Sequence, residues 1–227
     1  TRVGAPTPTL LRAWGPCPMP AVTRARCEGG VFGWRVVVSV RGSASSGRAS
    51  VAWILASNLP AVAVFPIRTY PDPVLRLPAN PVADPTPELR RLVDDMLETM
   101  YAAPGVGLAA PQIGVSLRVI VFDAGEGPCH VLNPVIEEIS GEYLYEEGCL
   151  SVPDRYWEIS RPSFARVRGL DLDGNEVTYG GDLLLGRVLQ HEVDHLDGFL
   201  LLKRLGRRAR KQALRDLRIE SMERSSG

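Results

Sequence analysis

Residues 183–196 read LLLGRVLQHEVDHL, and this stretch sets the arrangement of the rest of the chain. Its apolar side chains follow helical spacing, which predicts a buried α-helix over these residues. His191 and His195 are four residues apart, so both side chains project from one face of that helix, one turn apart. We therefore expect a central helix with the other elements packed around it.

The two histidines on this helix are candidate metal ligands. Imidazoles at this spacing can bind one metal ion, and Glu192 is placed to take a proton from a metal-bound water. The alternative is two unconnected histidines on a surface helix. The chain has only three His, however, and two of them fall here with Glu192 between them. His130 has no such neighbourhood, and we interpret it as structural.

The helix alone supplies too few ligands, because a catalytic site of this kind takes three protein ligands and a water. The extended metalloprotease pattern would place a third histidine at position 201, which is Leu201. The best remaining candidate is Cys149, since a thiolate is a strong ligand for divalent iron, zinc or nickel. The alternative for Cys149 is a small buried hydrophobe, the commoner fate of a free cysteine. The missing third histidine favours the ligand.

The remaining elements are read from periodicity and turn signals. Thr86 followed by Pro87 and Glu88 predicts a helix start, and Met96 and Met100 lie on its apolar face as core residues. Strands are predicted near residues 117–122, 131–139 and 142–147, a hairpin over 164–172 and 176–179, and a charged helix over 207–223. Because strands mostly precede the central helix, the fold class is α+β.

Composition limits the classes of function. The chain has 227 residues and a formal net charge of zero, so its overall charge does not indicate DNA as a partner. No apolar run is long enough for a membrane span, so we expect no membrane contact. The four cysteines form no dense framework, which favours a reducing compartment.

Residues 1–61 look like a different kind of sequence. They are rich in Pro, Gly, Ser, Ala and Arg, with seven Arg and one Glu giving a net charge of +6. We favour a disordered extension or a mis-set reading frame, since the sequence begins with Thr1. An organelle transit peptide is the second interpretation and a secretory signal the third. The expected domains are therefore this extension and a catalytic domain over residues 62–227.

Three segments resemble, in order, the signature motifs of the peptide deformylase family. They are GVGLAAPQ at residues 105–112, EGCLS at 147–151 and QHEVDH at 190–195. Three motifs in order are highly specific, and the resemblance extends over residues 62–205. It implies antiparallel sheets around the central helix that carries the metal-binding motif. Residues 62–68 resemble the beginning of bacterial members, so we expect the natural start near Val62.

The resemblance implies a metal-dependent hydrolase. In the family, the residues matching Cys149, His191 and His195 bind one divalent metal ion, often Fe²⁺, with Zn²⁺, Ni²⁺ or Co²⁺ as substitutes. The reaction removes the formyl group from the N-terminal formyl-methionine of newly made proteins and releases formate, a step of protein biosynthesis and N-terminal methionine processing. The implied location is the bacterial cytoplasm, or an organelle if the extension is a transit peptide.

The family's chemistry assigns roles to further residues. The side-chain amide of Gln112 and the backbone N–H of Leu150 would stabilise the oxyanion, and Glu192 would act as general base and then general acid. The expected substrate-binding residues are Gly105, Val106, Gly107, Val188 and Arg155, with Leu150 also lining the methionine pocket. Family members often carry a substrate-binding arginine several residues after the cysteine, and Arg155 is the candidate for it in this chain. Asp194 either orients part of the site or forms a structural salt bridge.

Two other functions and a second partner are alternatives for this chain. The first other function is a metalloprotease or amidase with the same two-histidine helix, which Leu201 argues against. The second is a member of the family that has lost its activity, which the intact ligands and Glu192 argue against. The basic side chains of the C-terminal helix are expected to form a solvated face. A ribosomal contact near the exit tunnel is the alternative, and would suit a substrate that is a nascent peptide.

Overall fold

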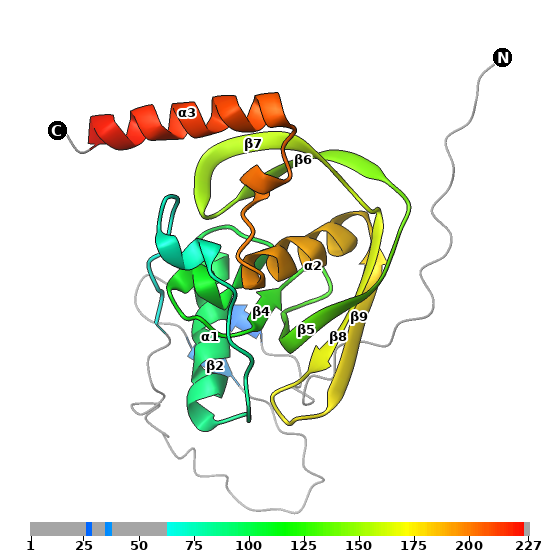
Figure 1. Ribbon diagram of the computed structural model, residues 1–227. Helices are drawn as coiled ribbons and strands as arrows, with labels where there is room; N and C mark the ends of the chain where they lie inside the picture. The colour runs from blue at the N-terminus through cyan, green and yellow to red at the C-terminus, as the bar shows by residue number, and fades with distance from the viewer. Residues whose placement is uncertain (1–25, 29–34, 38–62, 225–227) are drawn as a thin grey trace, which may run out of the picture. The chain divides into compact units, whose positions relative to one another are not determined.

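The computed structural model describes residues 26–28, 35–37 and 63–224 (Figure 1). The chain divides into two units, Thr1–Leu59 and Pro60–Gly227. In the first unit, β1 (Arg26–Glu28) pairs antiparallel with β2 (Arg35–Val37). The predictions for residues 1–61 fall almost entirely outside the described residues and stay predictions. The description below concerns the second unit.

A five-stranded antiparallel sheet forms one side of this unit. Its strand order is β3-β4-β5-β8-β9, with β3 at Gly107–Ala109, β4 at Val119–Phe122, β5 at Cys129–Ser140, β8 at Phe164–Leu170 and β9 at Glu176–Asp182. The long strand β5 pairs first with β4 and then with β8. A bulge lies between Leu132 and Val135, where Asn133 has a positive φ of 51° and Pro134 has no N–H to donate.

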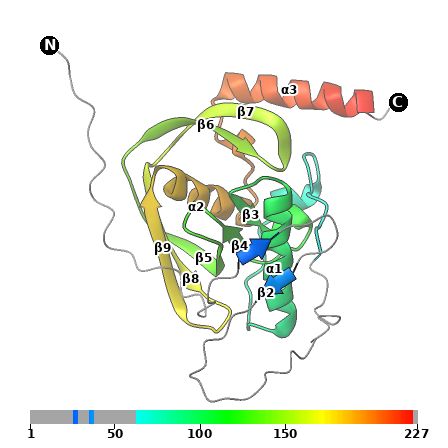
Figure 2. The same ribbon diagram turned by 180° about the vertical axis from the view of Figure 1, so that it is seen from behind.

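Helix α2 (Leu183–Leu196) lies at the centre, as the sequence predicted (Figures 1 and 2). One side of it packs against β3, β4, β5, β8 and β9. A Cβ atom on Gly186 would meet the carbonyl oxygen of Gly181 at 2.6 Å and that of Ser163 at 2.8 Å, so only glycine allows this close approach. On the other side lies a separate hairpin of β6 (Tyr143–Cys149) and β7 (Val152–Arg161).

Helix α1 (Pro87–Ala102) begins where the sequence predicted. The Thr86 hydroxyl accepts a hydrogen bond from the Leu89 N–H at 3.3 Å, and Pro87 occupies the first turn. Its buried face packs against β3 and β4, and Met96 and Met100 are fully buried in that core, as expected. Short 3-10 helices at Pro73–Arg76 (η1), Ala110–Ile113 (η2) and Leu201–Lys203 (η3) complete the connections.

Helix α3 (Arg207–Arg224) runs along the outside of the β6–β7 hairpin (Figure 1). Ala213 and Leu217 on its inner face join a core cluster with Val152 and Ile159 of β7. Its other face is exposed and carries the basic side chains that the sequence predicted. Among the described residues, no helix combines the length and the apolar character needed to cross a membrane.

Candidate metal centre

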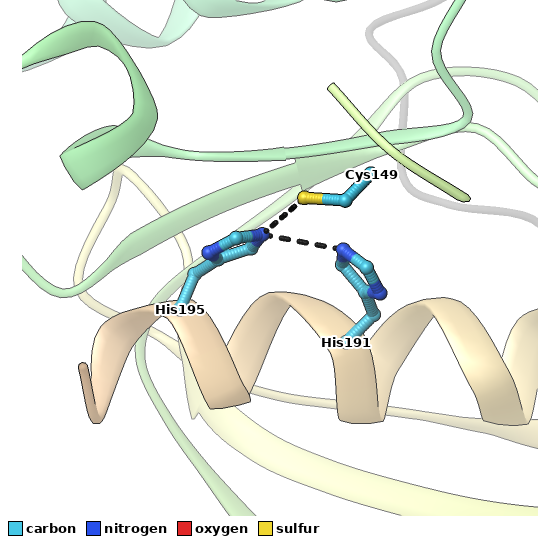
Figure 3. A group of neighbouring side chains, drawn as sticks. All are labelled: Cys149, His191 and His195. Atoms are coloured by element: carbon cyan, nitrogen blue, oxygen red, sulfur yellow. Dashed lines mark hydrogen bonds between the residues drawn. The ribbon is translucent and has the colours of Figure 1, made fainter. Parts of the chain in front are cut away.

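Cys149, His191 and His195 converge on one point between β6 and α2 (Figure 3). Their ligand atoms all lie within 4.8 Å of one another. The Cys149 sulfur is 3.2 Å from Nε2 of His195, and that nitrogen is 3.2 Å from Nε2 of His191. Two imidazole nitrogens and one thiolate suit divalent zinc, iron or nickel, and leave a coordination position for water. The arrangement can therefore hold a metal ion.

The electrostatics of this centre favour a positive charge. Burial alone would lower the pKa of His191, but its interactions with Cys149 and a hydrogen bond to Glu147 outweigh it and raise that pKa well above the usual value. A site that draws a proton onto an imidazole also stabilises a cation that takes the proton's place. For His195, burial and the nearby His191 lower the pKa, which keeps its ring neutral, as metal binding requires.

Glu147 is a candidate functional residue that the sequence analysis did not single out. One of its oxygens is 2.6 Å from Nδ1 of His191. A carboxylate only accepts hydrogen bonds, so Nδ1 carries the proton and Nε2 is left to bind a metal. Burial opposes the charge on Glu147, but hydrogen bonds from His191 and Arg161 hold its pKa far below the usual value. Its place at the start of the EGCLS motif, two residues before Cys149, was the signal that could have found it.

Glu192 lies beside the metal centre without a partner for one of its oxygens. Its Oε2 is buried and has no hydrogen-bond partner among the described residues. Burial raises its pKa to about 7, although the charge on His191 opposes the shift. Oε1 approaches the backbone of Gly107 so closely that a Cβ there would lie 2.4 Å from it. A carboxyl group in this position can take up and release a proton at neutral pH.

Gln112 is fixed next to the candidate ligand Cys149. Its Oε1 accepts a hydrogen bond from the Ala109 N–H at 2.8 Å, which orients the amide. Its Nε2 donates to the Ser151 hydroxyl at 3.2 Å and lies 3.9 Å from the Cys149 sulfur. The amide N–H₂ is therefore held toward the metal centre. Ser151, which follows Leu150 in the turn after β6, is a second neighbour that sequence reasoning did not assign.

A cavity of about 440 Å³ opens beside these residues. All the residues that the sequence assigned to substrate binding line it, namely Gly105, Val106, Gly107, Val188 and Arg155, and so do Gln112 and Leu150. Val188 is buried, whereas Val106 is exposed at the rim. The volume suits a side chain with part of a peptide backbone. Arg155 also forms an ion pair with Glu220 of α3, so part of its charge is already matched.

The remaining predictions near the centre concern Asp194 and position 201. Asp194 accepts hydrogen bonds from Arg161 at 2.9 Å and from Nε of Arg204 at 3.0 Å, which fits the salt-bridge interpretation. Leu201 is buried in the cluster beneath β7 and offers no ligand, as expected. His130 lies on β5, where Nε2 accepts the Leu172 N–H at 3.3 Å, which fits a structural role.

Comparisons with known proteins agree on one family. A family model described as Polypeptide deformylase matches residues 64–211. The peptide deformylase of Acidothermus cellulolyticus is 48% identical over 157 residues, which cover 69% of this chain and 87% of that protein. A crystal structure of a peptide deformylase from Legionella pneumophila is similar with a TM-score of 0.67 and 40% identity, covering 73% of this chain and 99% of that one. A class I type b peptide deformylase from Acinetobacter baumannii, with Met-Ala-Ser bound, is similar with a TM-score of 0.60 and 35% identity, covering 64% of this chain and 100% of that one.

Proposed function

The chain belongs to the peptide deformylase family, and from that premise we propose which of its residues carry the family's reaction. The protein is a metal-dependent enzyme that removes the N-formyl group from newly made polypeptides and releases formate. The observation that carries the assignment of residues is the convergence of Cys149, His191 and His195 beside the unpartnered carboxylate oxygen of Glu192. Each role below rests on that arrangement.

The proposed metal ligands are Cys149 through sulfur and His191 and His195 through Nε2. The donor set and the affinity of the centre for positive charge support one divalent ion, and we propose Fe²⁺ as the native metal. When bound, such an ion lowers the pKa of a coordinated water and polarises a carbonyl oxygen. Glu147 would keep Nε2 of His191 directed at the ion, because it holds the Nδ1 proton.

Glu192 is the proposed general base and acid. Its pKa of about 7 places the carboxyl group between its two protonation states at neutral pH. Oε2 would take a proton from the attacking water as the C–O bond to the formyl carbon forms. It would then give that proton to the amine nitrogen as the C–N bond breaks. Formate and the N-terminal amine leave, the amine takes up the second proton of the water as an ammonium, and Glu192 returns to its starting state.

The oxyanion that forms at the formyl oxygen needs donors that are already in place. We propose the Gln112 amide and the backbone N–H of Leu150 for this role. The support is that the Ala109 N–H and the Ser151 hydroxyl fix the Gln112 side chain, so that its N–H₂ points to the centre without reorganisation. Leu150 directly follows the ligand Cys149 and lines the same cavity.

The cavity is the proposed site for formyl-methionine and the residues after it. Its apolar part, with Val188, Leu150 and Val106, suits the unbranched methionine side chain. The Gly105–Val106–Gly107 segment would pair with the substrate backbone, and Arg155 would contact the residues that follow. The relative from Acinetobacter baumannii with Met-Ala-Ser bound supports a cavity of this kind for a methionine peptide.

An assay on two peptides tests this function. Protein purified without oxygen should contain one divalent metal per chain and release formate from a formyl-Met peptide, but no acetate from the acetyl-Met peptide. Glu192→Gln should retain the metal and lose about 10²- to 10⁴-fold in kcat, the contribution of a placed general base. Glu158→Gln, an exposed carboxylate on β7, is the matched control. Cleavage of a peptide bond, or full activity in Glu192→Gln, would contradict the proposal.

We also propose the cytoplasm as the place of action and the ribosome as a second partner. The support is the exposed basic face of α3, with Arg207, Arg208, Arg210, Lys211, Arg215 and Arg218, which suits RNA phosphates. A nascent formyl-methionine peptide becomes available at the ribosome, so such a contact would raise its local concentration. Co-sedimentation with ribosomes tests this, and unchanged binding after these six side chains become Gln would refute it.

A further inference from the structure

Arg187 is a buried arginine on α2, one turn before the ligand His191, and the proposed function gives it no role. Only 6% of its surface is exposed. Nη1 donates to Oε2 of Glu147 at 2.6 Å and to the carbonyl oxygen of Ile159 at 3.2 Å. Nη2 donates to the carbonyl oxygen of Tyr143 at 2.8 Å. One guanidinium therefore joins α2 to both strands of the β6–β7 hairpin.

The same guanidinium stacks on two aromatic rings of β6. Its central carbon lies 5.4 Å from the ring centre of Tyr143 and 5.8 Å from that of Tyr145. The two rings are themselves stacked, with centres 5.4 Å apart and planes 15° apart. Tyr145 lines the substrate cavity, so Arg187 contacts both the carboxylate behind the metal ligand and a wall of the cavity.

These contacts matter because the proposed metal ligands come from a strand and a helix, β6 and α2, that no backbone hydrogen-bond ladder joins. Strand β6 carries Cys149 and Glu147, and α2 carries the two histidines. The β6–β7 hairpin is a separate two-stranded sheet and is not hydrogen-bonded to the five-stranded sheet. Side chains must therefore set the distance between β6 and α2. Arg187 makes the ion pair from α2 to Glu147, while Arg161 of β7 pairs with Glu147 inside the hairpin and reaches α2 through Asp194.

We infer that Arg187 is a positioning residue that holds β6 against α2, so that Glu147 orients His191 for the metal and Tyr145 stays at the cavity wall. This inference rests on the proposed metal centre. An arginine suits the role because its planar fork serves several acceptors and a ring face together, whereas lysine offers a single point charge. Loss of the side chain would leave Arg161 as the one guanidinium paired with Glu147, beside the His191 hydrogen bond.

The test compares three variants loaded with Zn²⁺, with the wild type as reference. Arg187→Leu should lose zinc to a chelator about 10- to 100-fold faster than the wild type, the usual effect of removing a residue that supports a metal ligand. Arg187→Lys keeps the charge near Glu147, so it should retain zinc to within about threefold, while KM rises because the stack on Tyr145 is lost. Arg168→Leu is the matched control, since Arg168 is exposed on β8 and pairs with Glu137 and Glu176 away from the centre.

Melting curves with and without zinc separate positioning from plain stability. A positioning role predicts that the rise in Tm on adding zinc shrinks in Arg187→Leu and not in Arg168→Leu. Equal zinc loss in Arg187→Leu and wild type, or an unchanged zinc-dependent rise in Tm, would overturn the inference. If Arg187→Leu does not fold, Arg187→Lys tests the inference instead. A wild-type KM in Arg187→Lys would overturn the inference. A wild type that holds no zinc and releases no formate would refute the proposed function instead.

Discussion

The absence of a side chain at Gly107 allows the proposed base, Glu192, to lie where it does. A Cβ atom there would lie 2.4 Å from Oε1 of Glu192 and 2.9 Å from Cγ1 of Val188. Real Cβ atoms do not approach other atoms so closely, so either β3 or the α2 side chains would have to move. The glycine therefore lets the start of β3 approach the buried carboxylate directly. In the sequence, the motif marked Gly107 as a substrate-binding residue but did not indicate its approach to Glu192.

We predict that Gly107→Ala lowers kcat/KM about a hundredfold or more, because a displacement of about 1 Å at the reacting groups has an effect of that size. The metal content should stay unchanged, since the atoms that this Cβ would meet first belong to Glu192 and Val188 and not to a proposed ligand. Steady-state kinetics and metal analysis measure the two quantities. Gly206→Ala is the control, because nothing lies within 4 Å of a Cβ at that position. Wild-type kinetics in Gly107→Ala would show that Glu192 need not lie where the structure has it.

Strands β3 and β7 are two elements that the sequence analysis did not predict, and their geometry explains why. Strand β3 has only three residues, all buried, so it has no alternation to detect and is defined by its pairing with β4. Strand β7 begins with Val152 and Pro153, and Asp154 has a positive φ of 60°. The register with β6 is irregular there, between Gly148 and Cys149. The bulge interrupts the alternating pattern by which strands are recognised.

At the scale of one element, His130 on β5 is predicted to make the free energy of unfolding depend on pH. Burial lowers its pKa, Arg90 adds to the shift and Asp171 opposes it, so the ring is neutral in the folded protein. In the unfolded chain His130 has a pKa of about 6.5, so below that pH the unfolded state binds more protons than the folded state does. The stability that His130 contributes is complete above that value and is lost as the pH falls toward the folded pKa. Protonation would also remove the acceptor for the Leu172 N–H.

Urea unfolding at pH 7 and pH 5 measures this effect in wild type and His130→Gln. The glutamine can still accept the Leu172 N–H but does not titrate. The wild type should lose more free energy of unfolding between the two pH values than the variant does. His191 and His195 are present in both proteins, so their contribution cancels in the comparison. An equal loss in the two proteins would contradict the prediction.

On the scale of the whole molecule, the chain divides just before the deformylase unit. The family match covers residues 64–211, and the second unit is Pro60–Gly227. Every residue that the proposed reaction uses lies in that unit. We propose that residues 1–61 take no part in the chemistry, in keeping with their basic, Pro- and Gly-rich composition.

A protein that begins at Pro60 should therefore keep its kcat/KM on a formyl-Met peptide to within about twofold, the range of changes distant from a site. Its metal content and Tm should also match those of the full chain. The full chain, prepared in parallel, is the control. A tenfold lower kcat/KM, or failure of the shorter chain to fold, would mean that the first unit supports the second.

The sequence by itself determined the central helix and picked out the three candidate metal ligands and the proposed base. Residues 183–196 carry helical periodicity and a local ligand spacing, and three linear motifs resemble one family, so this information lies within short segments. Only the tertiary structure decided that Glu147 orients His191, that Arg187 links α2 to β6, and that Glu192 lies against Gly107. Those contacts join residues about 40 or more positions apart. Their geometry depends on how the hairpin and the sheet enclose the helix, and no local pattern encodes it.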